Sequence, residues 1–137
     1  MNTALFSGVG KYQSLGLLVM RLGLGMAFII YGYPKITGGQ EMWTGIGAAM
    51  GNLGITAYPV AWGFVAAVTE FVGGILLILG LFFRPATLLM LVVMIVATIH
   101  HQVAGDPFTT MLHPIELASV FLGLFFAGPG RYSVDGK

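Results

Sequence analysis

The sequence contains no cysteine and very little charge. Without cysteine the chain cannot form disulfides, thiol relays or cysteine-held iron–sulfur clusters, and it cannot attach haem covalently. Charged residues make up 8% of the 137 residues, whereas a soluble globular domain has about a quarter. The net charge of +1 gives no basic surface for nucleic acid. Any electrons that the protein handles must therefore arrive on a molecule or partner that it binds.

Hydrophobic residues make up 57% of the chain, and they are gathered into long stretches. A helix needs about 20 largely apolar residues to cross the hydrocarbon core of a bilayer. Four stretches meet this requirement: 14–34, 59–82, 85–104 and 111–128. The sequence therefore predicts an all-α fold, an integral membrane four-helix bundle that forms a single transmembrane domain over residues 1–137.

The connection between the first two stretches is rich in glycine and too short for a fifth span. Large apolar residues nevertheless recur in it at helical spacing: Met42, Trp43, Ile46, Met50 and Leu53. This pattern predicts a short interfacial helix or a re-entrant segment.

Basic residues in short loops favour the cytoplasmic side of a membrane. One side of the predicted bundle carries Lys11, Arg84, Arg131 and Lys137, and the other carries Lys35. Arg21 interrupts the first apolar run, which predicts a span rather than a cleaved signal peptide. We expect a multi-pass protein of a bacterial-type inner (plasma) membrane with both termini in the cytoplasm.

Two charged residues of opposite sign fall inside the spans. Counted from the expected outer ends of their helices, Arg21 lies about 18 Å down and Glu70 about 16 Å down. Charges in hydrocarbon are costly and usually pair inside the bundle. The sequence therefore predicts an ion pair between Arg21 and Glu70, which serves either as a structural clamp or as a ligand contact.

The segment ATIHHQVAGDPFTTMLHPIE, residues 97–116, holds all three histidines of the chain. His100 and His101 close the third span, and His113 and Glu116 share a face at the start of the fourth. We expect these four side chains to form an outward-facing polar cup, in which histidine can exchange protons near neutral pH.

Three interpretations of this cup remain open from the residues. The histidines are simply solvated, or His100, His113 and Glu116 hold a metal ion or haem, or the cup polarises the oxygens of an amphipathic molecule such as a quinone. In the last case Lys35 joins the ligand-binding set, although a lysine at a span end also snorkels to lipid headgroups.

Four motifs then carry a family resemblance. RLGLGMAFIIYGYPKI, TEFVGGILLILGLFFRPA, HPIELASVF and GPGRYSVD occur in this order along the chain and together resemble the DoxX family of small four-span membrane proteins. The characteristic positions of that pattern correspond here to Arg21, Lys35, Glu70, Gly73, Gly74, Arg84, Glu116 and the GPGRYSVD end. The resemblance implies a role in membrane redox chemistry, because relatives include the small subunit of thiosulfate:quinone oxidoreductase and proteins associated with oxidative stress or quinone resistance.

Two functional hypotheses follow. In the first, the protein is a quinone-linked redox component, in which His100, His101, His113 and Glu116 handle protons and Arg21, Lys35 and Glu70 shape the ligand pocket. It holds no covalent cofactor, and a redox partner protein or a diffusible donor supplies electrons. In the second, it is a non-catalytic membrane subunit or hydrophobic-ligand carrier that scaffolds a partner enzyme. The oligomeric state stays open, with a homo-oligomer among the alternatives.

Overall fold

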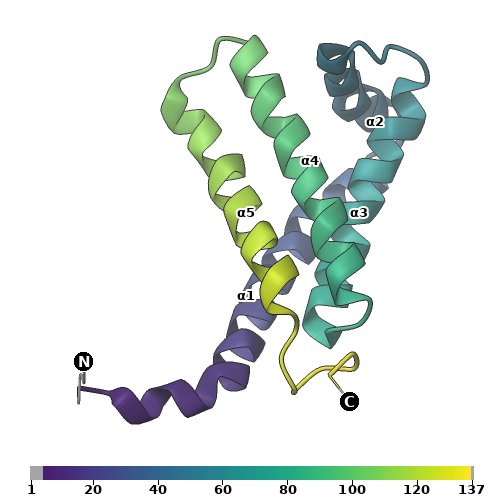
Figure 1. Cartoon of the computed structure of the whole chain (residues 1–137). Helices are drawn as coiled ribbons and strands as arrows, with labels where there is room; N and C mark the ends of the chain where they lie inside the picture. The colour runs from purple at the N-terminus through teal and green to yellow at the C-terminus, as the bar shows by residue number, and fades with distance from the viewer. Residues whose placement is uncertain (1–4, 137) are drawn as a thin grey trace.

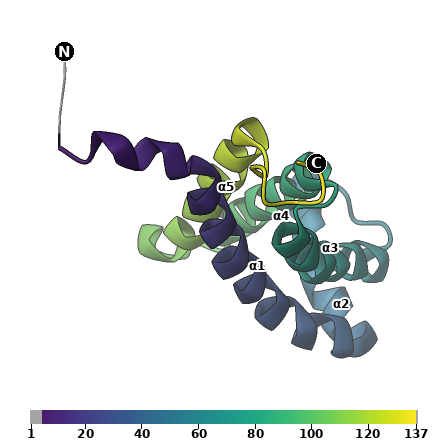
Figure 2. The same cartoon turned by 90° about the horizontal axis from the view of Figure 1, so that it is seen from below.

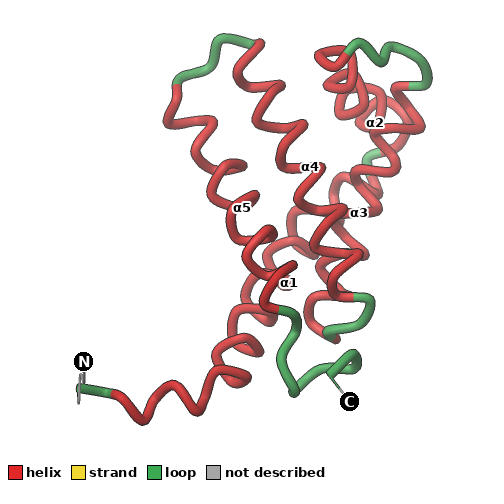
Figure 3. The backbone as a smooth tube through the Cα atoms, in the orientation of Figure 1, coloured by secondary structure: helices red, strands yellow, loops and turns green. Residues whose placement is uncertain are grey.

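The computed structural model describes residues 5–136, and all regular structure within this range is helical (Figures 1 and 3). The five α-helices are α1 (Gln13–Thr37), α2 (Gly39–Gly47), α3 (Pro59–Leu79), α4 (Phe83–Val103) and α5 (Phe108–Ala127). Two 3-10 helices, η1 (Ser7–Tyr12) and η2 (Ala48–Leu53), precede α1 and follow α2. Four of the helices, α1 together with η1, α3, α4 and α5, are long and apolar enough to cross a membrane. The predicted all-α membrane bundle is confirmed.

The four long helices form two closely packed pairs. Helix α1 packs on α3, α4 packs on α5, and the turn between α3 and α4 joins the pairs. Figure 1 shows both termini and this turn at one end of the molecule, which we call the terminal end. The opposite end, the loop end, carries α2 and the connection between α4 and α5, and there the two pairs diverge (Figure 1).

Glycines set the register between α1 and α3. A Cβ on Gly25 would lie 2.6 Å from the carbonyl oxygen of Gly74, and a Cβ on Gly32 would lie 2.7 Å from the nitrogen of Phe71. Small residues let membrane helices approach to backbone contact. Because α1 also continues beyond Pro34 to Thr37, its last turn extends above the level of Phe71.

Helix α2 is the short helix expected between the first two spans, and it packs against α3. A Cβ on Gly63 of α3 would overlap the carbonyl oxygen of Trp43, and one on Gly47 would overlap that of Pro59. The indole Nε1 of Trp43 donates to the carbonyl oxygen of Lys35 at 2.8 Å. Backbone contact and this hydrogen bond therefore hold α2 against the last turn of α1 and the first turns of α3.

We expect Gly63→Ala to destabilise the protein, although Gly→Ala in a helix interior normally stabilises by about 1 kcal/mol. The new methyl group would overlap the Trp43 carbonyl, and overpacking of this kind costs about 1–3 kcal/mol. Gly23→Ala is the matched control, because a Cβ there meets nothing within 4 Å. In thermal unfolding in detergent micelles, the unfolding temperatures of the two variants should shift in opposite directions from the wild type. Shifts in the same direction would contradict this packing of α2.

The core lies where the two helix pairs meet. Its buried apolar side chains are Phe28, Leu77, Phe83, Met90, Met94, Phe121 and Leu124. The rings of Phe28 and Phe121 lie 5.3 Å apart between centroids and connect α1 to α5. Large apolar side chains also cover the outward faces of the long helices, as expected for surfaces in contact with lipid.

Candidate functional site

Arg21 is buried within the bundle, and its guanidinium binds main-chain carbonyl groups. Its Nε donates to Leu77 O at 2.9 Å and its Nη2 donates to Ile78 O at 2.7 Å. Its Nη1 donates to Tyr132 O at 2.9 Å and to Pro129 O at 3.2 Å. Arg21 therefore joins the C-terminal end of α3 to the C-terminal segment of the chain.

The predicted ion pair between Arg21 and Glu70 is wrong. Equal depth for the two charges requires the ends of α1 and α3 to be level. The glycine contacts instead set Gly32 opposite Phe71, so Arg21 lies beside Ile78, about 12 Å along α3 from Glu70. Helix register, which single-helix counting does not include, decided the partners.

The segment Gly128–Gly136, which we call the C-terminal clasp, completes the hydrogen bonding at the end of α3. Gly80 ends this helix with φ 66°, and its own N–H and that of Leu81 bond back to Leu77 O and Leu76 O. The last two carbonyls accept from the clasp, Leu79 O from Val134 N and Gly80 O from Asp135 N. Every carbonyl in this last turn therefore has a donor, which a helix end near hydrocarbon requires.

The same clasp and one further arginine satisfy the ends of α4 and α5. The carboxylate of Asp135 accepts from the N–H groups of Phe82 at 3.2 Å and Phe83 at 2.7 Å, so it caps the positive start of α4. Arg84 Nε donates to Phe125 O at 2.9 Å, and its Nη2 donates to Phe126 O at 3.3 Å. The GPGRYSVD motif and Arg84 thus serve helix ends, a role for Arg84 and Asp135 that the sequence pattern did not reveal.

The buried carboxylate of Glu70 pairs with Lys35. The Lys35 Nζ lies 2.9 Å from both carboxylate oxygens. The Glu70 side chain is 6% exposed, whereas the Lys35 side chain is 35% exposed. An ammonium group has three donors, so two hydrogen bonds to Glu70 leave one N–H of Lys35 for a further acceptor.

Tyr31 on α1 and His113 on α5 form a second contact, between aromatic rings. Tyr31 lies one turn before Lys35 on α1, which places both on one helical face. The ring of Tyr31 meets the imidazole of His113 on α5 edge to face, with centroids 6.4 Å apart. Both side chains are exposed, so lipid can reach them.

The predicted polar cup is not assembled. His100 Nδ1 lies 3.3 Å from Asn52 Nδ2, and His101 Nδ1 lies 2.6 Å from Asp106 Oδ2. Glu116 is exposed, and within residues 5–136 no hydrogen bond or salt bridge joins it to a histidine.

Helix length explains this difference. Helix α5 begins at Phe108, so Glu116 lies about 12 Å from its start, whereas His100 lies about 4.5 Å from the end of α4. The two side chains are therefore at different levels. The alternative metal site at His100, His113 and Glu116 is not formed either, since residues 5–136 contain no cluster of three potential ligands.

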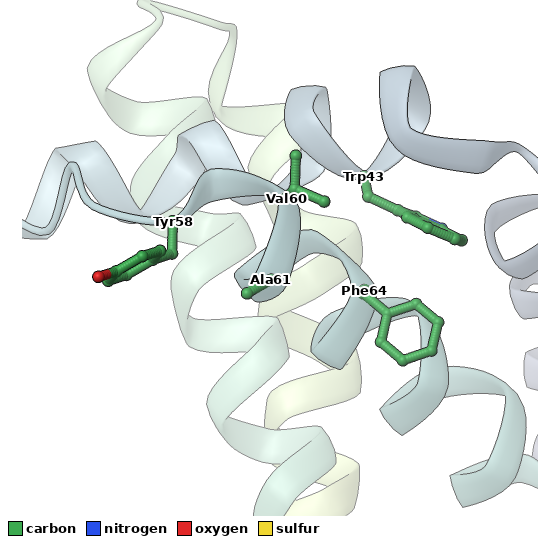
Figure 4. A pocket seen from close by; sticks show the side chains of 5 residues that line it. All are labelled: Trp43, Tyr58, Val60, Ala61 and Phe64. Atoms are coloured by element: carbon green, nitrogen blue, oxygen red, sulfur yellow. The ribbon is translucent and has the colours of Figure 1, made fainter.

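An open apolar pocket of about 430 Å³ lies on the outer side of α2 and α3. Figure 4 shows its lining residues, which are Trp43 of α2, Val60, Ala61 and Phe64 of α3, and Tyr58 just before α3. The Trp43 and Phe64 rings meet edge to face with centroids 4.9 Å apart. With an apolar lining and no titratable partner except the Tyr58 hydroxyl, this pocket suits an acyl chain better than a reacting group.

Comparison with known proteins gives the family. The profile of the DoxX family matches residues 16–102. The inner membrane protein YphA of Escherichia coli K12 is 29% identical to this chain. The matched region covers 98% of this chain and 99% of YphA. An uncharacterized protein of Haemophilus influenzae is 35% identical over 93% of each chain, and the E. coli inner membrane protein YqjF is 26% identical over 91% of this chain and 93% of its own. No solved structure matches. The chain belongs to the DoxX family.

Proposed function

Starting from membership of the DoxX family, we propose that this protein is an inner-membrane, quinone-linked redox component. It binds the polar head of a quinone or a similar amphipathic molecule beside the Lys35–Glu70 pair. The single observation that carries the proposal is this pair, in which a buried carboxylate orients a half-buried ammonium. An ammonium with a free N–H beside lipid suits a quinone carbonyl oxygen.

The neighbours of Lys35 fit the other needs of a quinone head. Tyr31 offers an aromatic face, and His113 across from it offers a titratable imidazole. Reduction of a quinone to a quinol takes up two electrons and two protons. In this proposal His113 transfers the protons, and a partner redox protein or diffusible donor supplies the electrons.

The ligand set in this proposal differs from the sequence prediction. Arg21 donates to four carbonyl oxygens at the terminal end, so it stabilises the fold and does not contact the ligand. His100 and His101 remain candidates only for proton exchange at the loop end, since their neighbours are Asn52 and Asp106. Lys35, Glu70 and His113 are the residues retained for binding.

The proposed orientation places the ligand site in the outward half of the membrane. Lys11, Arg84 and Arg131 belong to segments at the terminal end (Figure 1), and Lys35 belongs to the other half of α1. This bias favours a cytoplasmic terminal end. The printed names of the two E. coli relatives support an inner-membrane location.

A quinone titration with His113→Gln tests the proposal. Quenching of the tryptophan fluorescence by a short-chain ubiquinone analogue should saturate with the wild type, since Trp43 bonds to the Lys35 carbonyl. Loss of one hydrogen-bond partner costs about 1.4 kcal/mol, so we expect the Kd to rise about tenfold. The matched control is His101→Gln, because His101 pairs with Asp106 in the α4–α5 connection. No saturable binding, or equal Kd values for both variants, would refute the site.

One observation favours the second hypothesis, a non-catalytic subunit or carrier. Among residues 5–136, every buried side-chain nitrogen and oxygen atom has a hydrogen-bond partner, as in a scaffold whose polar groups fix helix positions. On this alternative the wild type would not bind quinone, and it would instead be recovered with a partner enzyme whose activity falls when this chain is deleted.

A further inference from the structure

A second, polar pocket lies at the terminal end, far from Lys35 along α1. Its volume is about 650 Å³, and it is formed between η1, the first turn of α1 and the C-terminal clasp. The side chains in its lining that carry polar groups are Lys11, Tyr12, Gln13, Ser14, Arg131 and Tyr132. No aspartate or glutamate lines it, so its charge is positive.

The two basic side chains are held in place without a carboxylate. Lys11 Nζ lies 5.2 Å from the centroid of the Tyr12 ring, and the Arg131 guanidinium carbon lies 5.4 Å from that of Tyr132. The Tyr132 hydroxyl accepts from Arg131, which raises the pKa of that guanidinium. The carboxylate of Asp135, four residues along the chain from Arg131, accepts hydrogen bonds from the N–H groups at the start of α4.

The position and the residues of η1 favour a place for this pocket at the surface of the bilayer. Figure 2 shows η1 projecting sideways from the bundle, at the end of the first span. Its neighbourhood exposes large apolar side chains, with Leu5 at 78%, Phe6 at 76% and Val9 at 57%. Apolar groups beside a lysine and tyrosines are typical of a segment that lies in the headgroup region.

We propose that this pocket binds the phosphate of an anionic phospholipid headgroup between Lys11 and Arg131. The hydroxyl of Ser14 already accepts from the Arg131 N–H at 3.3 Å, which holds the clasp against the start of α1. A bound phosphodiester adds a bridge between these two chain segments. Its acyl chains lie along the apolar side of η1, so the lipid stabilises the terminal end.

Native mass spectrometry of the full-length protein in an uncharged detergent tests this proposal. Phosphatidylglycerol and phosphatidylcholine with the same acyl chains are titrated separately. We expect preferential binding of phosphatidylglycerol, and a loss of about 30-fold in its affinity in the variant Lys11→Gln/Arg131→Gln, the size expected for two basic residues at a membrane surface. Lys11→Arg/Arg131→Lys keeps both charges and should keep the preference.

A second arm separates the two sources of phosphate. Millimolar inorganic phosphate should leave phosphatidylglycerol bound if the site requires the lipid. If phosphate displaces the lipid from the wild type and has no effect on the Gln variant, the same two residues bind phosphate as such, and the anion site stands. Equal binding of the two phospholipids, or unchanged binding by the Gln variant, would overturn the proposal, and neither result depends on the quinone site.

Discussion

Arg21→Met is expected to cause the largest loss of stability of any single substitution in this chain. Methionine keeps much of the side-chain volume but removes all four hydrogen bonds, those to Leu77 O, Ile78 O, Tyr132 O and Pro129 O. A hydrogen bond to a charged group contributes about 1.5–3 kcal/mol, and a buried carbonyl without a partner costs about 1–3 kcal/mol. We therefore expect a loss of about 4 kcal/mol or more in the free energy of unfolding.

The measurement is unfolding by sodium dodecyl sulfate in mixed micelles, followed by circular dichroism. If Arg21→Met does not fold, the loss of stability can be measured in Arg21→Lys. The lysine ammonium retains the charge but cannot span four carbonyls. Glu41→Gln is the control, since this exposed carboxylate of α2 should change stability by less than about 0.5 kcal/mol. A loss below about 1 kcal/mol in Arg21→Met would show that the four contacts do not hold the terminal end.

Arg21→Lys also separates the fold from the proposed site. The lysine variant should bind quinone with an unchanged Kd wherever it is folded, because Arg21 donates to the C-terminal clasp and not to the Lys35–Glu70 pair. Hydrogen exchange should be faster in residues 129–135, since two of the carbonyls that anchor this segment lose their donors.

The second large effect is expected from breaking the Lys35–Glu70 pair from either side. Lys35→Met leaves a carboxylate that is 6% exposed without its partner, and an unpaired buried charge costs about 3–5 kcal/mol. Glu70→Gln leaves the ammonium, which is 35% exposed and can extend toward the headgroups. We expect this variant to lose about 1–2 kcal/mol, less than Lys35→Met.

The double variant Lys35→Met/Glu70→Gln completes a thermodynamic cycle. It should be more stable than Lys35→Met alone, because the neutral amide no longer has a charge to bury, and the coupling energy should be about 2 kcal/mol. Glu41→Gln, an exposed carboxylate in the first turn of α2, serves as the control. Additive losses in the cycle would mean that the two side chains act independently.

The fold could be predicted from the sequence because its determinants are local. Apolar stretches of span length, separated by glycines and prolines, specify four helices whatever their mutual arrangement. The same reasoning found the short helix α2 from the spacing of Trp43 and its neighbours. It also identified Arg21, Lys35 and Glu70 as unusual, since a charge within an apolar span is visible without any structure.

The partners of those charges could not be predicted from the sequence in the same way. The signs and counted depths of Arg21 and Glu70 match and predict a pair, but the register set by Gly25, Gly32 and Gly74 places Arg21 at the end of α3. The closeness of the three histidines in the sequence predicts a single cup. In the structure His100 lies beside Asn52 of η2 and His113 beside Tyr31 of α1.

The amino-acid sequence alone determined that this chain is a membrane bundle of four helices and which few residues carry its charge, because hydrophobicity and helix length are properties of single segments. Only the tertiary structure decided that Lys35 pairs with Glu70 and that Arg21 and Asp135 serve helix ends. The physical reason is that a buried charge takes the partner that helix register and side-chain reach bring within about 3 Å, and register arises from backbone contact between glycines far apart in the chain.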